Sequence, residues 1–368
     1  MKLCVLQPGS REPEQQFPNY AGSPDPSLPP PLGYRGLAAC TGGAVYRDDA
    51  RVPSDERRVL LVLNRNLKAC RQTVINLRRA GKTIVLALEK TGSFEINQWL
   101  RSPSDLTVLR EICARAHAGL AITADIEPVL RAGGLLYVET IPQPLPVDVP
   151  EWDFSEPAEN RHGILLGTWD WQNPLKRHLE ALLSLRDVAG QMYEPVTVFN
   201  LDGWRGRRWL RQLDYPAGLL RVIERRLPYV EYLKKMACHK MVFQLDSSGG
   251  SGRVAGDALL CRIPCVGGTG ATERIAFPEL CGHGVNTPDL ALTASRLLDH
   301  SHDREMAVES ALNLAGQRIS FNAVQHRIDY GVHGVDHLSC GRLASLVPQP
   351  KHTVINKEWR RLHCSSNR

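Results

Sequence analysis

The sequence predicts an α/β protein made of two doubly wound, Rossmann-like domains. With 368 residues, the chain exceeds one ordinary hydrophobic core and suits two domains of roughly 100 to 150 residues each. Short apolar segments alternate with amphipathic, helix-like segments in both halves of the chain, which is typical of parallel sheets covered by helices. Residues 143–160 carry prolines and acids without periodicity, and we expect a linker between the domains there.

Each predicted strand of the first half is a short apolar run. Residues 2–6 and 59–63 are bounded by turn formers, as buried strands of a parallel sheet are. The prolines and glycines of residues 8–36 exclude a persistent helix or central strand and predict a long loop over the ligand crevice. The further elements that we expect in this half are a helix at 67–79, a strand at 83–89, a helix at 105–116, and strands at 119–125 and 136–142.

The same rhythm starts again after the linker. The predicted strands lie at 162–171, which includes a loop, and at 195–202, 239–245 and 263–268. The predicted helices lie at 175–189, 229–237, 253–261, 288–299 and 303–318. In a doubly wound sheet, the ligand crevice lies at the carboxyl ends of the strands.

Composition argues against a membrane protein. The chain is 43% hydrophobic and 23% charged, as globular proteins are, and no run approaches the roughly 20 apolar residues that span a bilayer. The apolar stretch before Pro8 is too short for a secretory signal. We therefore expect a cytoplasmic protein.

The cysteines and the net charge of +6 indicate which metals and which charged partners the chain could bind. Ten cysteines occur singly, and Cys261 and Cys265 have no second pair to complete a zinc site, so we expect reduced, buried thiols and no metal. Basic residues concentrate at 204–212, 224–226 and 357–363. They suit a polyanion such as nucleic acid or lipid headgroups, or they form only a solvated face.

The most informative segment is the Ser-Ser-Gly-Gly-Ser-Gly sequence at 247–252, which joins a strand to a helix beginning at Arg253. Glycines allow a close approach of the backbone, and the helix N-terminus favours an anion such as a nucleotide diphosphate. Arg253 adds a planar cation for phosphate oxygens. Asp257 lies one turn further on the same face, where it could accept hydrogen bonds from ribose hydroxyls. Alternatively, the glycines only make a tight turn and Asp257 is a surface acid.

Two segments after residue 160 share an order of strand, loop and helix: ILLGTWDWQNPLKRHLEAL (164–182) and YVEYLKKMACHKMVFQLDSSGGSGRVAGDALLCRIPCVGGTG (229–270). In this order and spacing the chain resembles the GT-B glycosyltransferases, in particular the retaining group that uses nucleotide-sugars. The resemblance covers residues 160–330 well and the first half only in outline. It implies two domains facing a cleft: an acceptor domain at 1–155 and a donor domain at 160–330, with a tail at 335–368 packing back on the first.

Two departures from the family pattern affect the site. The family's paired acids fall on Gly249 and Asp257, so only the second carboxylate remains. Its basic pair falls near Thr168 and Asn173, which leaves Lys176, Arg177 or Arg253 to supply positive charge. The resemblance implies retention of the anomeric configuration, and the missing first acid leaves this outcome open. The resemblance also implies a reaction without a metal or another cofactor.

The candidate residues come from both halves. Catalytic candidates are Arg253, Asp257 and Asp125, the last as a general base or, alternatively, as a helix N-cap. Candidates for binding the donor are Gly167, Thr168, Lys176, Arg177, Ser248, Gly249, Gly250, Ser251, Gly252, Gly268, Thr269 and Glu273. Glu273 is alternatively an exposed acid at a helix start, and the Gly268–Thr269 turn is alternatively a plain connection. Trp169 and Trp171 could stack on a base or a sugar, or be buried.

The sequence thus predicts transfer of a sugar from a nucleotide-diphosphate sugar, such as a UDP-sugar, to an acceptor hydroxyl on a glycan, a small molecule or a modified DNA base. Three alternatives stay open. They are a DNA-modifying glucosyltransferase of phage type acting on hydroxymethylated bases, a catalytically inactive GT-B binding protein, and a nucleotide-sugar epimerase or hydrolase.

Overall fold

The computed structural model describes residues 2–19, 21–168 and 170–329. Two sheets organise this part of the chain, one with seven strands and one with five. The first uses residues 4–140 and the second residues 164–267. The fold is therefore α/β with parallel sheets, as the alternation of apolar and amphipathic segments predicts. The predicted domain limits stay predictions, and the predicted tail at 335–368 lies outside the described residues.

The first sheet has the strand order β2-β3-β1-β4-β5-β6-β7. All its neighbours pair in parallel except β2, which is antiparallel to β3 at the edge. Its central strands are almost fully buried, which explains their continuous apolar sequences. The strands are β1 (Cys4–Leu6), β2 (Gln15–Gln16), β3 (Ala44–Tyr46), β4 (Arg58–Leu63), β5 (Thr83–Leu88), β6 (Ala118–Ala121) and β7 (Val138–Thr140).

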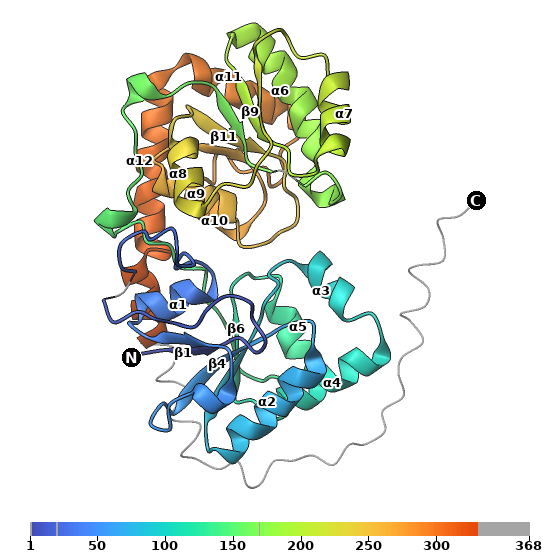
Figure 1. Cartoon of the computed structure of the whole chain (residues 1–368), viewed down its shortest axis with the longest axis vertical. Coiled ribbons are helices and arrows are strands. Elements are labelled where there is room, and N and C mark those ends of the chain that lie inside the picture. Colours follow the sequence, from blue (N-terminus) through green and yellow to red (C-terminus); the bar gives the residue numbers. More distant parts are fainter. Residues whose placement is uncertain (1, 20, 169, 330–368) are drawn as a thin grey trace, which may run out of the picture. The chain divides into compact units, whose positions relative to one another are not determined.

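Five α-helices connect these strands: α1 (Tyr34–Cys40), α2 (Leu67–Arg79), α3 (Ser93–Trp99), α4 (Pro103–Cys113) and α5 (Glu127–Ala132). α2 and α4 contact each other and lie side by side (Figure 1). Their apolar side chains, including Val74 and Ile112, join those of β4 and β5 in one buried cluster. This core fixes the first sheet and the edge at which its strands end.

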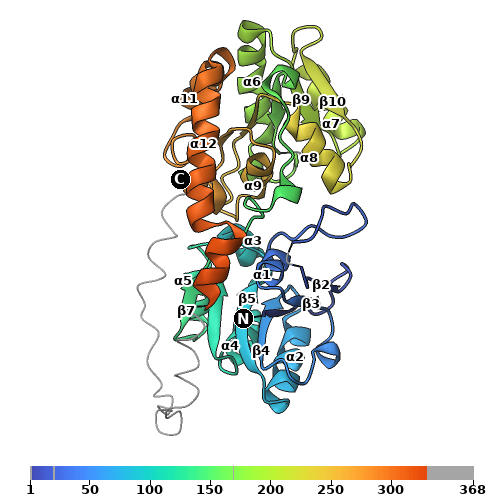
Figure 2. The ribbon, with the colours of Figure 1, turned by 90° about the vertical axis from the view of Figure 1, so that its left-hand side faces the viewer.

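The second sheet is parallel throughout, with the order β10-β9-β8-β11-β12. Its strands are β8 (Ile164–Leu166), β9 (Val196–Phe199), β10 (Leu220–Ile223), β11 (Met241–Gln244) and β12 (Cys265–Gly267). Its helices are α6 (His178–Met192), α7 (Trp204–Gln212), α8 (Tyr229–Ala237), α9 (Arg253–Leu260), α10 (Ala271–Ala276), α11 (Thr287–Asp299) and α12 (Ser301–Arg318). α11 and α12 pack against each other in both views (Figures 1 and 2).

The structure corrects several local expectations. The proline-rich segment 8–36 contains the edge strand β2, and α1 begins inside it at Tyr34. α6 begins three residues later than predicted, because Pro174–Lys176 form a 3-10 turn and Arg177 is left-handed with φ 45°. The sequence analysis missed β3, α3, α7 and β10. All four are short, α7 exposes most of its side chains, and no residue of β10 is fully buried, so few of their residues are apolar and buried.

The predicted linker is more fixed than expected. Leu145 and Trp152 are buried, and the Trp152 indole N–H donates a hydrogen bond to Gly22 O at 3.0 Å. Leu145 N–H donates to Ile319 O at 2.8 Å. Segment 143–160 therefore packs as part of the fold, because its isolated apolar residues find distant partners.

The sequence analysis expects no membrane-spanning segment, and the structure tests this expectation for helices in the described residues. None of the helices in the described part of the chain is long and apolar enough to cross a bilayer.

Candidate functional site

The glycine-rich loop joins β11 to α9 as predicted. Gly249 has φ 65° and Gly252 has φ 79°, and glycine adopts this left-handed region without steric cost. Ser248 N–H donates to Asp246 Oδ1 at 2.9 Å. Ser251 N–H donates to Thr91 Oγ1 at 3.1 Å. Two amides of the loop thus have partners within the chain, and these bonds hold the loop in its turned form.

The start of α9 presents further N–H groups. Gly256 N–H donates to Gly252 O at 3.1 Å, so the amides of Arg253, Val254 and Ala255 precede the first bond of the helical ladder. Unpaired amides and the helix dipole favour an anion at this end. The local geometry is therefore that of an anion-binding helix start.

Arg253 stands at the first position of α9 and is exposed. Its guanidinium carbon lies 5.5 Å from the centre of the Tyr229 ring, in the range of a cation–π contact. No ion pair to Arg253 is found among the described residues. Its charge is thus held in place by an aromatic ring and stays available to an anion.

Asp257 lies one turn further along α9 and is buried, with 3% exposure. It accepts a hydrogen bond from the Tyr229 hydroxyl at 2.6 Å. Burial raises the pKa of Asp257 to about 6, although Arg253 and the Tyr229 hydrogen bond oppose the shift. The alternative that Asp257 is a surface acid is wrong, and its contact with a ribose hydroxyl stays a prediction.

Glu273 lies in the first turn of α10, is 2% exposed, and joins two glycine-rich loops. Gln244 Nε2 donates to its Oε1 at 2.8 Å, and its Oε2 has no hydrogen-bond partner among the described residues. An added Cβ would lie only 2.0 Å from the carboxyl group at Gly252, 2.9 Å at Gly268 and 2.5 Å at Gly270. These glycines therefore let both loops close around one carboxyl group.

The environment of Glu273 changes its protonation. Burial raises its pKa to about 7, and the nearby Asp246 contributes in the same direction. Hydrogen bonds from its own backbone and from Gln244 oppose the shift. The alternative that Glu273 is an exposed helix-start acid is wrong. On the same loop, Thr269 N–H donates to Asp246 O at 2.8 Å, which anchors the Gly268–Thr269 turn to the end of β11.

The two other basic candidates are already paired. Lys176 Nζ forms an ion pair with Asp246. Arg177 Nε donates to Glu180 Oε2 at 2.8 Å, and Arg177 Nη2 donates to Thr287 Oγ1 at 2.9 Å. Their charges are compensated in this structure, in contrast to that of Arg253.

The carboxyl end of β8 brings the predicted residues Thr168 and Trp171 together with His178, which the sequence analysis missed. Thr168 Oγ1 lies 2.9 Å from His178 Nδ1, and the rings of His178 and Trp171 meet edge to face at 4.3 Å. Burial lowers the pKa of His178 to about 4. Neither His178 Nε2 nor Trp171 Nε1 has a hydrogen-bond partner among the described residues. Because His178 opens a helix eleven residues after Gly167, no local pattern marks it; Trp169 lies outside the described residues.

Gly167 serves the packing of this edge. A Cβ there would approach Val254 Cγ1 to 2.6 Å and Val242 Cγ1 to 3.0 Å. Glycine therefore lets α9 pack closely against the end of β8, and this places the helix start beside the polar group of Thr168 and His178.

Solved structures of trehalose-6-phosphate synthases are similar to this chain in fold. A trehalose-6-phosphate synthase is 13% identical with a TM-score of 0.58, covering 81% of this chain and 74% of the other. The alpha,alpha-trehalose 6-phosphate synthase from Burkholderia multivorans is 10% identical with a TM-score of 0.60, covering 82% and 75%. A structure from E. coli bound with UDP-2-fluoro glucose is 13% identical with a TM-score of 0.56, covering 79% and 74%. The chain has the GT-B fold. No protein-family model and no curated protein matches its sequence.

In this GT-B chain, the candidate acid of the first sheet lies near the glycine loop. Asp125 follows β6, and its Oδ2 is 2.7 Å from the point that a Cβ on Gly249 would occupy. The alternative N-cap role is wrong, because Ile126 is the N-cap of α5 and no side chain caps that helix. A carboxylate thus lies beside the position at which the family resemblance leaves a glycine. The role of Asp125 as a general base stays a prediction.

The GT-B chain has no group of three or more His, Cys, Asp or Glu side chains placed to hold a metal ion within residues 2–19, 21–168 and 170–329. The same residues include eight free cysteines, of which all but Cys238 are buried.

Proposed function

We propose that this chain transfers a sugar from a nucleotide-diphosphate sugar to an acceptor hydroxyl. One observation carries the proposal: the glycine loop 247–252 leads into a helix start with unpaired amides and an uncompensated arginine. The GT-B fold supports the proposal, because glycosyltransferases with solved structures share it at TM-scores of 0.56 to 0.60.

The site must stabilise the nucleotide diphosphate that leaves during the reaction. Negative charge builds on it as the glycosidic bond breaks, and fixed dipoles and cations that face this charge lower the barrier. The amides of Arg253, Val254 and Ala255 at the start of α9 and the Arg253 guanidinium would stabilise it. We propose that these protein groups do so without a metal, and that transfer retains the anomeric configuration.

The donor that we propose is a UDP-sugar, with UDP-glucose first in order. This choice is supported by the solved structures, one of which is bound with UDP-2-fluoro glucose and another of which is described as UDP-forming. In this chain, Asp257 would meet the ribose, and Glu273, protonated below about pH 7, would keep the two glycine loops closed around the donor.

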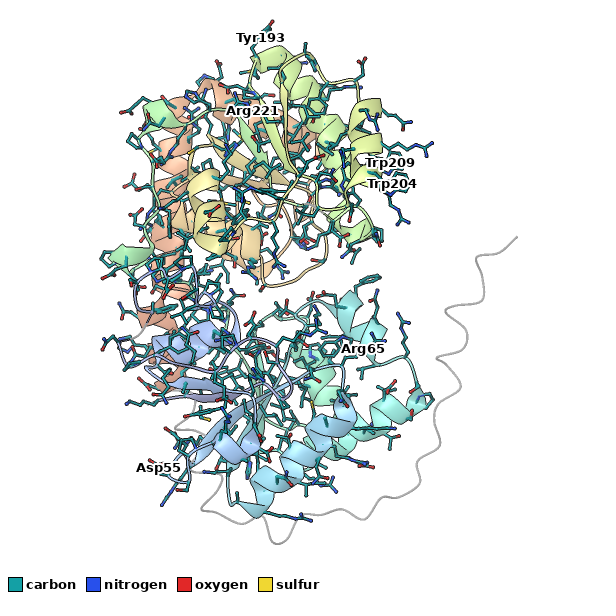
Figure 3. All side chains as sticks on the ribbon, viewed as in Figure 1. Asp55, Arg65, Tyr193, Trp204, Trp209 and Arg221 are labelled. Carbon is teal, nitrogen blue, oxygen red and sulfur yellow. The ribbon has the colours of Figure 1, made fainter. Side chains whose placement is uncertain are left out.

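The acceptor would bind at the carboxyl edge of the first sheet. A cavity of about 650 Å³ lies there, at the ends of β1 and β4. Its polar lining includes Arg11, Asn64, Arg65 and Glu89, and Figure 3 labels Arg65. Such groups suit a hydroxyl-rich molecule, because they offer both donors and acceptors. Asp125 lies beside Gly249 of the loop proposed to hold the diphosphate. As a general base, it would accept the proton of the hydroxyl that attacks from the face the diphosphate leaves, which is the geometry that retention requires.

A thermal-shift screen against nucleotide-sugars, followed by a transfer assay, tests the proposal. A donor at 100 times its Kd stabilises the folded state by about 2.7 kcal/mol. We expect UDP-glucose to raise the Tm, and radiolabelled sugar to appear in an acceptor. Stabilisation without transfer to any acceptor would favour an inactive binding protein. Conversion of the sugar without an acceptor would favour an epimerase or hydrolase.

A further inference from the structure

Helix α7 carries an exposed surface that the proposed sugar transfer does not use. The five residues Trp204, Arg205, Arg208, Trp209 and Arg211 form this arginine–tryptophan surface. Trp204 is 65% exposed and Trp209 is 48% exposed. Figure 3 shows both indoles pointing away from the second sheet. Two large aromatic side chains exposed on one helix among arginines form a contiguous surface, and such a surface is a candidate binding site.

The charge of this region is strongly one-sided. Residues 204–226 contain seven arginines and two acidic residues, a formal charge of +5 out of the chain's +6. Arg207 pairs with Glu224 and Arg225 with Glu231. No ion pair is found for Arg205, Arg208 or Arg211 among the described residues. The surface therefore keeps unneutralised guanidinium groups for a polyanion.

The fold positions this surface at the ligand edge of the second sheet. α7 follows the carboxyl end of β9, and a Cβ on Gly206 would lie 1.9 Å from Asn200 Oδ1 and 3.0 Å from Trp171 Nε1. The helix is thus packed tightly onto the edge that holds Trp171 and His178. Its arginines and tryptophans are fixed on a rigid element and start beside the candidate site.

The positions of the apolar residues on α7 argue against a lipid bilayer as the partner of this surface. Gly206, Leu210 and Leu213 turn inward and are buried. An interfacial membrane helix needs a broad apolar face toward the lipid, whereas the apolar face of α7 is already used against its own sheet. Two indoles among guanidinium groups remain outside.

Phosphates and unpaired bases fit the exposed guanidinium groups and indoles of α7. Guanidinium forks match phosphate oxygens, and exposed aromatic rings stack on bases of any sequence. In a duplex the base faces are covered by their neighbours, while in a single strand they are free. We propose that the arginine–tryptophan surface of α7 binds single-stranded nucleic acid. This inference needs no sugar donor and stands or falls independently of the transferase activity.

Fluorescence anisotropy of a labelled single strand of about 15 nucleotides and mixed sequence tests this directly. We expect binding that weakens with salt by a slope near −2, since three arginines each contribute about 0.7 for a single strand. Arg208→Glu with Arg211→Glu should weaken binding more than tenfold. The control, Lys68→Glu with Arg79→Glu on α2, removes the same charge at two exposed positions and should change binding less than twofold.

A second variant separates stacking from charge alone. Trp204→Ala should weaken binding of the single strand about fivefold or more and leave the weaker binding of the matching duplex unchanged. Equal losses in the α7 and α2 variants, or tighter binding of the duplex, would overturn the proposal. It would also fall if the protein bound vesicles of phosphatidylcholine and phosphatidylglycerol but no oligonucleotide. Unfolding curves of all variants should match the unsubstituted chain, because every substituted side chain is exposed.

Discussion

Two units of this molecule, β1 to α1 and β11 to α9, each connect a strand to a helix through a loop. The two loops are held in place by different contacts. Each helix starts after a glycine with positive φ, Gly33 with φ 60° and Gly252 with φ 79°, and each is largely buried. The first loop spans residues 7–33 and the second only residues 245–252. The difference lies in the buried charged group that holds each loop.

In the first unit, the buried group is fully satisfied. Arg35 is 4% exposed and donates to Glu12 Oε2 at 2.8 Å, Gln15 Oε1 at 2.9 Å and Pro13 O at 2.6 Å. In the second unit, Glu273 Oε2 has no partner among the described residues, and the pKa of Glu273 is raised. A satisfied buried charge stabilises a loop, while an incompletely satisfied one is typical of a functional site. We therefore expect a structural role for the first unit, and the proposed ligand-binding role for the second stays a prediction.

The two glycines provide the sharpest comparison and the largest expected effect. In Gly252→Ala, the new Cβ would lie 2.0 Å from Glu273 Oε2, and we expect a loss of about 4 kcal/mol in the free energy of unfolding, from this overlap and left-handed strain. In Gly33→Ala, nothing lies within 4 Å, so only the backbone strain of φ 60° with ψ −133° remains, about 2 kcal/mol. Urea unfolding of both variants measures the difference. Equal losses would mean that the two loops are held alike.

The second largest expected effect is the pH dependence of stability that the protonation of Glu273 causes. Its pKa is about 7 in the folded protein against 4.5 for the ordinary group, so the folded state binds more protons between these values. Stability therefore falls as pH rises from about 4.5 to about 7. Glu273→Gln removes this dependence, and we expect the variant to be more stable than the unsubstituted chain by about 3 kcal/mol at pH 8, but similar at pH 4.5. Unfolding at several pH values provides the measurement. Parallel pH profiles for both proteins would contradict a buried, protonated Glu273.

Removal of the uncompensated cation should affect turnover rather than folding. Arg253→Ala should lower kcat about 100-fold, the size expected when one group that stabilises transition-state charge is lost, and should leave the Tm nearly unchanged because Arg253 is exposed. Transfer kinetics with the donor found in the screen provide the measurement, and Arg110→Ala on the exposed face of α4 is the control. Comparable losses of turnover and stability would refute the donor role.

A substitution of Arg35 should lower stability and leave turnover unchanged, the reverse of Arg253→Ala. Its effect should be the smallest of the four. Arg35→Lys keeps the charge but loses the planar fork that reaches three acceptors. We expect a loss of about 2 kcal/mol in the free energy of unfolding and an unchanged kcat. Unfolding and transfer assays on the same preparation give both values. A drop in kcat at full occupancy with donor would show that the proline-rich loop takes part in the reaction.

Much of the fold follows from local patterns in the sequence. The strands β4, β5 and β11 are continuous apolar runs, and α2 and α8 have the predicted bounds. The glycine loop and the start of α9 at Arg253 were also predictable, because glycines between an apolar run and an amphipathic segment mark this geometry. Elements such as β3 and α3 were missed, because their stability comes from neighbours distant in sequence.

Sequence alone determined the alternation of the main buried strands with amphipathic helices, the glycine loop and the cation that follows it, because these depend on residues within a few positions of each other. Only the tertiary structure decided which charges are buried and which are paired. Glu273 becomes a buried acid through glycines at 252, 268 and 270, and Lys176 is compensated by an acid seventy residues away. The exposure of Trp204 and Trp209 likewise depends on which face of α7 the second sheet covers. Burial and pairing are set by contacts between distant segments, and no local pattern carries that information.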